Sequence, residues 1–307
     1  MESSVAIIIP CLNEVASIAD VVESFQEAVP AASIYVYDNG STDGTAEVAS
    51  GAGAIIRTHS TKGKGGVVRR MFSDVEADIY VMVDGDNTYD ASALPEMIAL
   101  LQQQSLDMVV GAREPVEIEV WRPGHEFGNR LLSGLVASIF GNRFTDLLSG
   151  YRVLSKRFVK TFPSHSGGFE IETEMTIHAL EMQIPFVEIK TRYAARHETS
   201  ESKLNTYRDG ARILRTIIQL IREERPFAFF GSFSLLFAIS SISLGAPVIV
   251  EFMNTGLVPR FPTAILATGL AILSALSFFA SLILDSIRLG RLETKRLAYL
   301  TYRPSDR

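Results

Sequence analysis

Residues 79–86 read Ile-Tyr-Val-Met-Val-Asp-Gly-Asp, an apolar run that ends in two carboxylates one residue apart. A short run rich in β-branched and aromatic residues predicts a buried strand. Asp84 and Asp86 would then lie at the carboxyl end of the strand, the edge at which open α/β sheets bind ligands. Two hard oxygen donors suit Mg²⁺ or Mn²⁺ held together with the phosphates of a substrate. A simple strand-end turn is the alternative, because Asp and Gly are common turn residues.

The first 200 residues alternate between strand patterns and helix patterns. This alternation predicts an α/β fold, a Rossmann-like and mainly parallel sheet with helices on both faces. The predicted strands are 5–9, 34–37, 54–57, 79–83, 108–110 and 185–189. The predicted helices are 14–28, a helix capped by Ser41 or Thr42 that runs to residue 50, 66–75, a helix from residue 90 or 92 to 103, 128–140 and 170–182.

Polar residues follow three of these strands, and parallel strands would bring them to one edge of the sheet. The segments are Pro-Cys-Leu-Asn-Glu at 10–14, Asp-Asn-Gly-Ser-Thr-Asp at 38–43 and Asp-Gly-Asp at 84–86. Such groups can hold a nucleotide through carboxylates and helix N-termini. Taken singly, each segment could merely cap a helix or form a turn.

Further basic residues suit a phosphate-rich ligand. Residues 62–66, Lys-Gly-Lys-Gly-Gly, lack the spacing of a nucleoside triphosphatase loop, but glycines allow close backbone approach and lysines attract anions. A surface loop is the alternative. Arginine forks also suit phosphate oxygens. The remaining candidates are Arg113, Arg130, Arg152, Arg192, Arg196 and Lys203.

Two C-terminal runs, 226–250 and 261–284, contain no charged residue. Each exceeds the roughly 20 residues that cross a bilayer core, so we predict a transmembrane hairpin rather than a buried helical pair. Basic residues concentrate outside the hairpin, which predicts cytosolic flanks. Residues 205–224 predict an amphipathic helix in the headgroup layer, or else a solvated helix packed on the preceding domain.

Composition narrows the function classes. A net charge of -6 argues against a nucleic-acid partner, and the single cysteine, Cys11, excludes an internal disulfide framework. The first residues lack a basic, apolar signal pattern, so we expect no cleavable signal peptide and a cytosolic N-terminal domain.

These motifs resemble family 2 glycosyltransferases of the GT-A fold. The segments at 10–14, 38–43, 63–65 and 84–86 carry the resemblance. Gly-Ala-Arg at 111–113, Thr-Asp-Leu-Leu-Ser-Gly-Tyr-Arg at 145–152, Ser-Lys-Leu at 202–204 and the two apolar runs extend it to polyprenyl-phosphate glycosyltransferases. That group includes dolichyl-phosphate mannose synthases and bacterial undecaprenyl-phosphate glucosyltransferases.

The resemblance implies metal-dependent, inverting transfer of a sugar from a nucleotide-diphosphate sugar to a membrane polyprenyl phosphate. A UDP-sugar is favoured as donor, with GDP-mannose as the alternative. The implied domains are a cytosolic GT-A domain at 1–204, the amphipathic helix at 205–225, a two-helix anchor at 226–288 and a cytosolic tail at 289–307. The implied location is the inner (plasma) membrane, with both termini cytosolic, and relatives suggest a homo-tetramer.

The family pattern also implies site residues. Asp84 and Asp86 would bind Mg²⁺ or Mn²⁺, and Arg113 and Arg130 would hold the lipid phosphate, with Ser133 nearby. Asp86, Arg113 and Arg130 would be the catalytic residues. The donor nucleotide would contact Pro10, Asn13, Glu14, Asp38, Gly40, Ser41, Lys64, Asp84 and Lys203.

Two departures and two rivals remain. Thr88 stands where relatives often carry a glutamine that helps the metal site, and Ser200 stands where they often carry a glycine. A processive polysaccharide synthase would share the fold, but the only tryptophan, Trp121, is not in the Gln-x-x-Arg-Trp motif of those enzymes. A non-catalytic membrane scaffold would bind no nucleotide with metal. The identity of the sugar stays open.

Overall fold

A computed structural model describes residues 3–115, 134, 144–164, 171–194, 214–215, 218–219 and 221–302. The chain divides into two compact units. The α/β unit comprises residues 1–216 together with 295–307, and the hairpin unit comprises residues 217–294.

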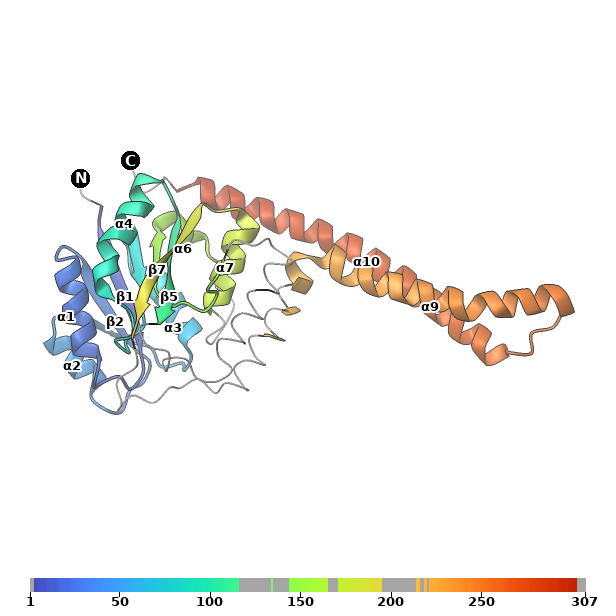
Figure 1. Cartoon of the computed structure of the whole chain (residues 1–307), viewed down its shortest axis with the longest axis horizontal. Helices are drawn as coiled ribbons and strands as arrows, with labels where there is room; N and C mark the ends of the chain where they lie inside the picture. Colours follow the sequence, from blue (N-terminus) through green and yellow to red (C-terminus); the bar gives the residue numbers. More distant parts are fainter. Residues whose placement is uncertain are drawn as a thin grey trace. The chain divides into compact units, whose positions relative to one another are not determined.

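The α/β unit contains one seven-stranded sheet in the order β3-β2-β1-β4-β6-β5-β7. Figure 1 shows this sheet among the helices of the unit. β1, β2, β3 and β4 pair in parallel, as do β5 and β7, while β6 is antiparallel to both of its neighbours. The strands are β1 (Val5–Cys11), β2 (Ser33–Asp38), β3 (Ile55–Thr58), β4 (Ile79–Met82), β5 (Met108–Pro115), β6 (Arg152–Ser155) and β7 (Phe186–Tyr193). The predicted α/β class and mainly parallel sheet are confirmed.

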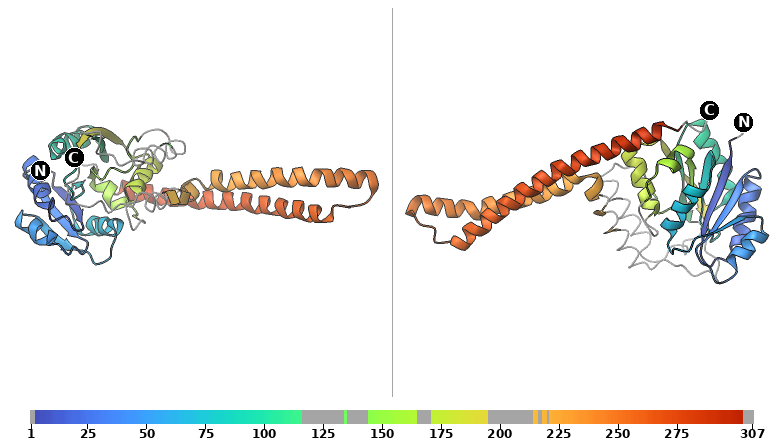
Figure 2. Two further views of the ribbon diagram at one scale, coloured as in Figure 1. Left: turned by 60° about the horizontal axis from the view of Figure 1, so that its bottom comes forward. Right: turned by 180° about the vertical axis from the view of Figure 1, so that it is seen from behind.

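Helices cover both faces of the sheet (Figures 1 and 2). On one face α1 and α4 pack on a core that includes Ile7, Ile9 and Val81, and on the other face α3 and α6 contact β1 and β4. The helices are α1 (Ile18–Ala28), α2 (Thr45–Gly51), α3 (Lys64–Asp74), η1 (Ala91–Ala93), α4 (Leu94–Gln103), α6 (Lys156–Thr161) and α7 (Ile171–Met182). The central strand β1 is apolar on both sides because both faces are covered.

Two helices, α1 and α2, begin later than the sequence predicts, because hydrogen bonds hold the residues before each of them in a loop. The cap predicted at Ser41 or Thr42 is wrong, because Gly44 precedes α2 and Asp43 accepts the Thr45 N–H at 3.1 Å. Residues 15–17 form a turn and α1 begins at Ile18, whose N–H donates to the Glu14 carbonyl at 2.9 Å. Both helices therefore begin later than predicted, and turns and bends connect them to the strand ends.

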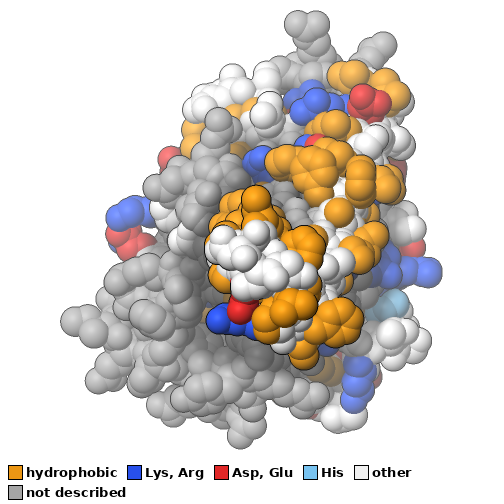
Figure 3. Space-filling view, turned by 90° about the vertical axis from the view of Figure 1, so that its right-hand side faces the viewer, with side chains coloured by type: hydrophobic (Ala, Val, Ile, Leu, Met, Phe, Trp, Pro, Cys, Tyr) orange, Lys and Arg blue, Asp and Glu red, His pale blue; other side chains and the backbone are white. Residues whose placement is uncertain are grey.

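The hairpin unit consists of α9 (Pro226–Thr255) and most of α10 (Phe261–Leu300), and hydrophobic side chains cover much of its described surface (Figure 3). Both helices are long and apolar enough to cross a membrane. Ser234 Oγ donates to the Ser274 carbonyl and Ser274 Oγ donates to the Ser234 carbonyl, each at 2.9 Å. Small residues and interhelical hydrogen bonds of this kind are typical of helix pairs in lipid.

The last turn of α10 belongs to the α/β unit. Lys295 pairs with Glu181 at 2.7 Å, and the Tyr299 hydroxyl donates to the buried carboxylate of Asp107. The guanidinium of Arg157 lies 4.6 Å from the centre of the Tyr299 ring. The predicted helix at 128–140 and most of the predicted amphipathic helix lie outside the described residues.

A buried histidine makes the stability of the α/β unit depend on pH. His178 of α7 packs against the rings of Phe158 and Phe162, and neither of its ring nitrogens has a hydrogen-bond partner among the described residues. Burial, aided by the charge of Lys295, lowers the pKa of His178 from 6.5 to about 3. Between pH 6.5 and about pH 3, the imidazole is therefore neutral in the folded state but protonated in the unfolded chain.

We expect the stability contributed by a neutral His178 to be complete above pH 6.5 and to be lost as the pH falls toward 3. The slope should be about 1.4 kcal/mol per pH unit. Denaturant unfolding of the full chain in detergent between pH 7 and pH 5 measures it. His178→Leu should flatten this slope, whereas His59→Gln, at a partly exposed site, should not. An unchanged slope in His178→Leu would show that other groups control this pH range.

Candidate active site

The loops after β1 and β2 are joined by hydrogen bonds at the sheet edge. The Asn13 N–H donates to Ser41 Oγ, and Asn13 Oδ1 accepts from the Thr42 N–H, each at 2.9 Å. Asp38 is 7% exposed and accepts from the N–H groups of Gly40 and Ser41. Asn13 and Gly40 both have positive φ, at 51° and 85°. The predicted convergence of the strand ends is confirmed for β1 and β2.

Asn39 holds the loop that leads into α3. Its side-chain amide donates to the carbonyls of His59 and Thr61 at 2.9 and 2.7 Å, and its Oδ1 accepts from the Gly63 N–H at 2.8 Å. Gly63 has a φ of 128°, a backbone conformation that L side chains rarely adopt. Asn39 thereby fixes the backbone from which Lys64 extends, a positioning role that the sequence did not suggest.

Lys64 lies between two carboxylates. Its Nζ is 2.5 Å from Asp84 Oδ1 and 2.5 Å from Glu172 Oε1, so α3, the end of β4 and α7 meet at one ammonium group. Burial alone would lower the pKa of Lys64, but the two carboxylates outweigh it and raise the pKa above its ordinary value. Burial raises the pKa of Glu172, and the charge of Lys64 opposes this rise. The two carboxylates therefore stabilise the charged form of Lys64.

Asp86 is 3% exposed and accepts a hydrogen bond from Thr88 Oγ1 at 2.7 Å. Thr88 thus orients the carboxylate of Asp86. Among the described residues, no group of three or more His, Cys, Asp or Glu side chains is arranged to hold a metal ion. The pair Asp84 and Asp86 fits a divalent cation only with further oxygen ligands, which a substrate diphosphate can supply. The residues present thus fit a metal–substrate complex rather than a site made of protein ligands alone.

Gly85 fits between the two aspartates because it has no side chain. A Cβ atom on Gly85 would lie 2.5 Å from Cys11 Sγ and 3.4 Å from Ile18 Cδ1. A Cβ atom on Gly150 would lie 2.6 Å from Asp84 Oδ2. Asp84 and Asp86 are therefore positioned by close backbone approach on two sides.

We expect Gly85→Ala to destabilise the protein by about 1–3 kcal/mol, because it overpacks a filled site. Cys11→Ala in the same chain should recover most of this loss by removing the atom that the new methyl group meets. Thermal unfolding of the single and double variants measures the effect. Gly51→Ala is the matched control, since a Cβ there meets nothing within 4 Å. Equal destabilisation in the single and double variants would contradict this packing.

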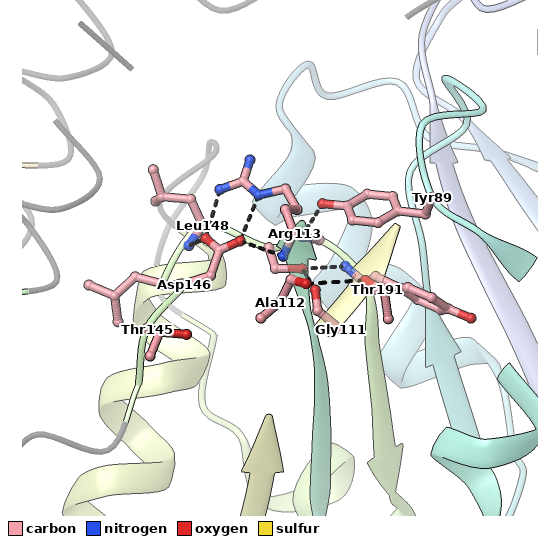
Figure 4. Close-up of polar contacts among 12 residues, drawn as sticks. Tyr89, Gly111, Ala112, Arg113, Thr145, Asp146, Leu148 and Thr191 are labelled. Atoms are coloured by element: carbon pink, nitrogen blue, oxygen red, sulfur yellow. Dashed lines mark hydrogen bonds and ion pairs between the residues drawn. The ribbon is translucent and has the colours of Figure 1, made fainter. Parts of the chain in front are cut away.

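Arg113 forms a two-pronged ion pair with Asp146 (Figure 4). Its Nε and Nη2 atoms donate to the two Asp146 carboxylate oxygens at 2.7 Å each, and its backbone N–H donates to the same carboxylate at 3.2 Å. Burial tends to raise the pKa of Asp146, but hydrogen bonds and charge from Arg113 outweigh it and lower the pKa. The guanidinium also lies 5.5 Å from the centre of the Tyr193 ring. Arg113 is therefore a rigid, permanently charged group.

Arg152 fixes the loop that carries Asp146. This arginine is fully buried and donates to the carbonyls of Leu147 and Ser149 and to Thr176 Oγ1, each at 3.0 Å. Ser149 Oγ in turn donates to the Gly111 carbonyl at 2.6 Å. Arg152 thus serves a structural purpose rather than lying exposed to a ligand.

Aromatic side chains connect the aspartate pair with Arg113. The Gly150 N–H donates to the Tyr89 hydroxyl at 2.9 Å, beside Asp84. The Tyr89 ring packs against Tyr193, over which Arg113 lies. Contacts of Tyr89 and Tyr193 therefore link the surroundings of Asp84 to Arg113.

The structure brings most of the predicted site residues to this edge of the sheet. Pro10 pairs with Tyr37 across β1 and β2, and the backbone N–H of Glu14 donates to Thr45 Oγ1 at 2.9 Å. Arg130, Ser133 and Lys203 lie outside the described residues, so their roles stay predictions. The sequence pattern did not reveal the buried partners Glu172, Asp146, Tyr89 and Asn39. Of these four residues, only Asn39 and Asp146 lie in segments that carry the family resemblance, 38–43 and 145–152.

Comparison with known proteins identifies the family. Residues 6–161 match the model of the protein family described as Glycosyl transferase family 2. Glycosyltransferase AglJ of Haloferax volcanii is 34% identical over 255 residues, which cover 81% of this chain and 82% of AglJ. Dolichol-phosphate mannosyltransferase of Pyrococcus furiosus is 27% identical over 288 residues, covering 88% of this chain and 78% of that protein.

A solved structure shares the fold. Glucosyl-3-phosphoglycerate synthase from Mycobacterium tuberculosis, crystallised with Mn²⁺, uridine diphosphate and glucosyl-3-phosphoglycerate, has a TM-score of 0.59 and 20% sequence identity. The match covers 73% of this chain and 80% of the synthase. The family match, the AglJ relationship and the α/β architecture agree with the motifs at the sheet edge, and the chain belongs to the family 2 glycosyltransferases.

Proposed function

We propose that this glycosyltransferase moves a sugar from a nucleotide-diphosphate sugar to a polyprenyl phosphate at a membrane surface. The observation that carries the proposal is the combination of the carboxylate edge and a buried, charged Arg113 with two helices apolar enough to cross a membrane. The similarity to a protein named dolichol-phosphate mannosyltransferase supports a polyprenyl-phosphate acceptor.

On the donor side, the loops after β1 and β2 would hold the nucleotide, with Asp38 and Asn13 as the central polar groups. A divalent cation, Mg²⁺ or Mn²⁺, would bind at Asp84 and Asp86 and stabilise the departing diphosphate as a Lewis acid. Lys64 would add a positive charge on the same side. We favour a UDP-sugar, with GDP-mannose as the alternative donor.

On the acceptor side, Arg113 would hold the lipid phosphate, together with Arg130 and Ser133. A phosphate oxygen attacks the anomeric carbon, the bond from that carbon to the donor diphosphate oxygen breaks, and the nucleoside diphosphate leaves with the electron pair. A single displacement inverts the anomeric carbon. The acceptor is already an anion near pH 7, so no general base is needed, and catalysis is positioning plus electrostatics.

The proposal includes a location. Residues 226–288 would anchor the chain in the plasma membrane, with the catalytic domain and both termini in the cytosol, because basic residues concentrate before and after the hairpin whereas its loop carries only Arg260. Residues 205–225 would lie at the headgroup layer, and the chain would assemble as a tetramer.

Titration calorimetry with Mn²⁺ and a panel of nucleoside diphosphates tests the donor side. We expect one nucleotide to bind only when Mn²⁺ is present and Asp84→Ala to lose this binding. Binding that is equally strong without metal would contradict the metal role, and no nucleotide binding at all would favour the scaffold alternative.

A further inference from the structure

The Asp84–Lys64–Glu172 cluster is more than a donor contact. Glu172 lies in α7, outside the strand-end segments that the family resemblance marks, and its carboxylate is as close to Lys64 Nζ as that of Asp84 is, at 2.5 Å. Asp84 is one of the two aspartates proposed to hold the cation. One of its oxygens is therefore engaged by an ammonium group belonging to the protein.

The two carboxylates differ in exposure. The side chain of Asp84 is 29% exposed, whereas those of Glu172 and Lys64 are 4% and 9% exposed. A ligand that enters from solvent reaches Asp84 but not Glu172. A cation that enters from solvent would therefore compete with Lys64 for Asp84 and would leave the Lys64–Glu172 ion pair in place.

The backbone of Lys64 is fixed while its ammonium group can move. Lys64 is the first residue of α3 and follows Gly63, whose N–H is held by Asn39 at 2.8 Å. A lysine carries a compact charge on a flexible four-carbon stem. The charged ammonium group of Lys64 can thus move over a short distance without movement of the sheet or of α3.

We propose that Lys64 is the resident counter-ion of Asp84, that a divalent cation displaces it, and that Glu172 is a positioning residue that keeps the displaced ammonium beside the donor diphosphate. This inference rests on the proposed donor site at Asp84 and Asp86. Lys64 then opposes binding of the cation alone and favours binding of the cation together with the nucleotide. Displacement of Lys64 from Asp84 therefore makes the cation bind more tightly when the donor diphosphate is also bound.

Electron paramagnetic resonance of free Mn²⁺, with the full chain in detergent, measures metal affinity directly. Mn²⁺ is titrated alone and again with saturating uridine diphosphate as the probe. We expect Lys64→Met to bind Mn²⁺ alone on the order of tenfold more tightly than wild type. We expect uridine diphosphate to tighten Mn²⁺ binding less in this variant than in wild type, because the charge shared with the diphosphate is gone.

A paired variant separates local competition from net charge. Lys64→Met with Glu172→Gln removes one positive and one negative charge, so the net charge of the cluster is that of wild type. If Lys64 competes locally for Asp84, this double variant still binds Mn²⁺ alone more tightly than wild type. Lys64→Arg keeps a cation at the position and should bind Mn²⁺ alone as weakly as wild type.

The outcomes distinguish the claims. Equal Mn²⁺ affinity in wild type and the double variant would overturn the counter-ion role, since only net charge would then matter. Absence of Mn²⁺ binding in wild type, even with nucleotide, would instead overturn the proposed metal site. Thermal unfolding verifies that each variant is folded, and Lys64→Gln, which keeps a hydrogen-bond donor between the carboxylates, replaces Lys64→Met if that variant is unstable.

Discussion

Asp86→Asn should lower the rate of sugar transfer by a factor of about 10²–10³ while leaving the fold intact. The change keeps the size of the side chain and an acceptor for the Thr88 hydroxyl, which donates to Asp86 Oδ1 at 2.7 Å. It removes one of the two negative charges proposed to hold the cation on the donor diphosphate. The loss should fall on the chemical step, because departure of the nucleoside diphosphate depends on that charge.

Transfer of radiolabelled sugar to lipid, at saturating donor and acceptor, measures this loss. Asp20→Asn is the matched control, since it makes the same chemical change at an exposed position of α1. The control should transfer sugar at the wild-type rate. Undiminished transfer by Asp86→Asn would contradict the metal role of the pair.

Arg152→Met should destabilise the α/β unit by about 3–5 kcal/mol. Methionine fills much of the same volume but leaves the carbonyls of Leu147 and Ser149 without their donor in the interior. Each buried carbonyl left unsatisfied costs about 1–3 kcal/mol. The residues affected adjoin Asp146, so Arg113 should also lose its fixed orientation.

Thermal unfolding of the full chain in detergent measures this effect, and the melting temperature should fall by roughly 10 °C. Arg70→Met is the control, because Arg70 pairs with Asp74 on an exposed helix surface, where such pairs contribute about 0–1 kcal/mol. Equal stability of Arg152→Met and wild type would show that the loop tolerates an apolar replacement.

The main architecture is predictable from sequence because parallel strands have strong local signals. Runs such as Ile7–Ile9 and Ile79–Val83 are apolar throughout, as strands buried on both faces must be. The ends of β1, β2 and β4 meet because neighbouring parallel strands share one direction. The strand pattern alone is therefore enough to locate the two aspartates at the carboxyl end of β4, beside the ends of β1 and β2.

β6 and α6 escape prediction from the sequence for a physical reason. β6 has the sequence Arg-Val-Leu-Ser, which is too short and too polar at its ends to show the hydrophobic alternation of a strand. It is stabilised by pairing with β4 on one side and β5 on the other. The Ser155 side chain then caps α6 by accepting the Phe158 N–H at 3.2 Å. Such elements are stabilised by tertiary pairing rather than by local preference.

The buried partners of the site are also beyond local pattern. Glu172 and Asp146 are distant in sequence from the cations that they bind, Lys64 and Arg113. A helix with acidic residues reads as a solvated surface helix, yet α7 is buried along most of its length. Only the ion pair between Glu172 and Lys64 in the folded chain brings this carboxylate close to Asp84.

Identification of the lipid product by mass spectrometry tests the central claim most directly. Membranes that contain the full chain are incubated with several nucleotide sugars and polyprenyl phosphate, and the lipid extract is compared with that of Asp86→Asn membranes. The proposed function predicts a polyprenyl-phosphate-linked single sugar that forms from one donor and is missing with the variant. A polymer, or sugar transfer only to acceptors that lack a polyprenyl phosphate, would contradict it.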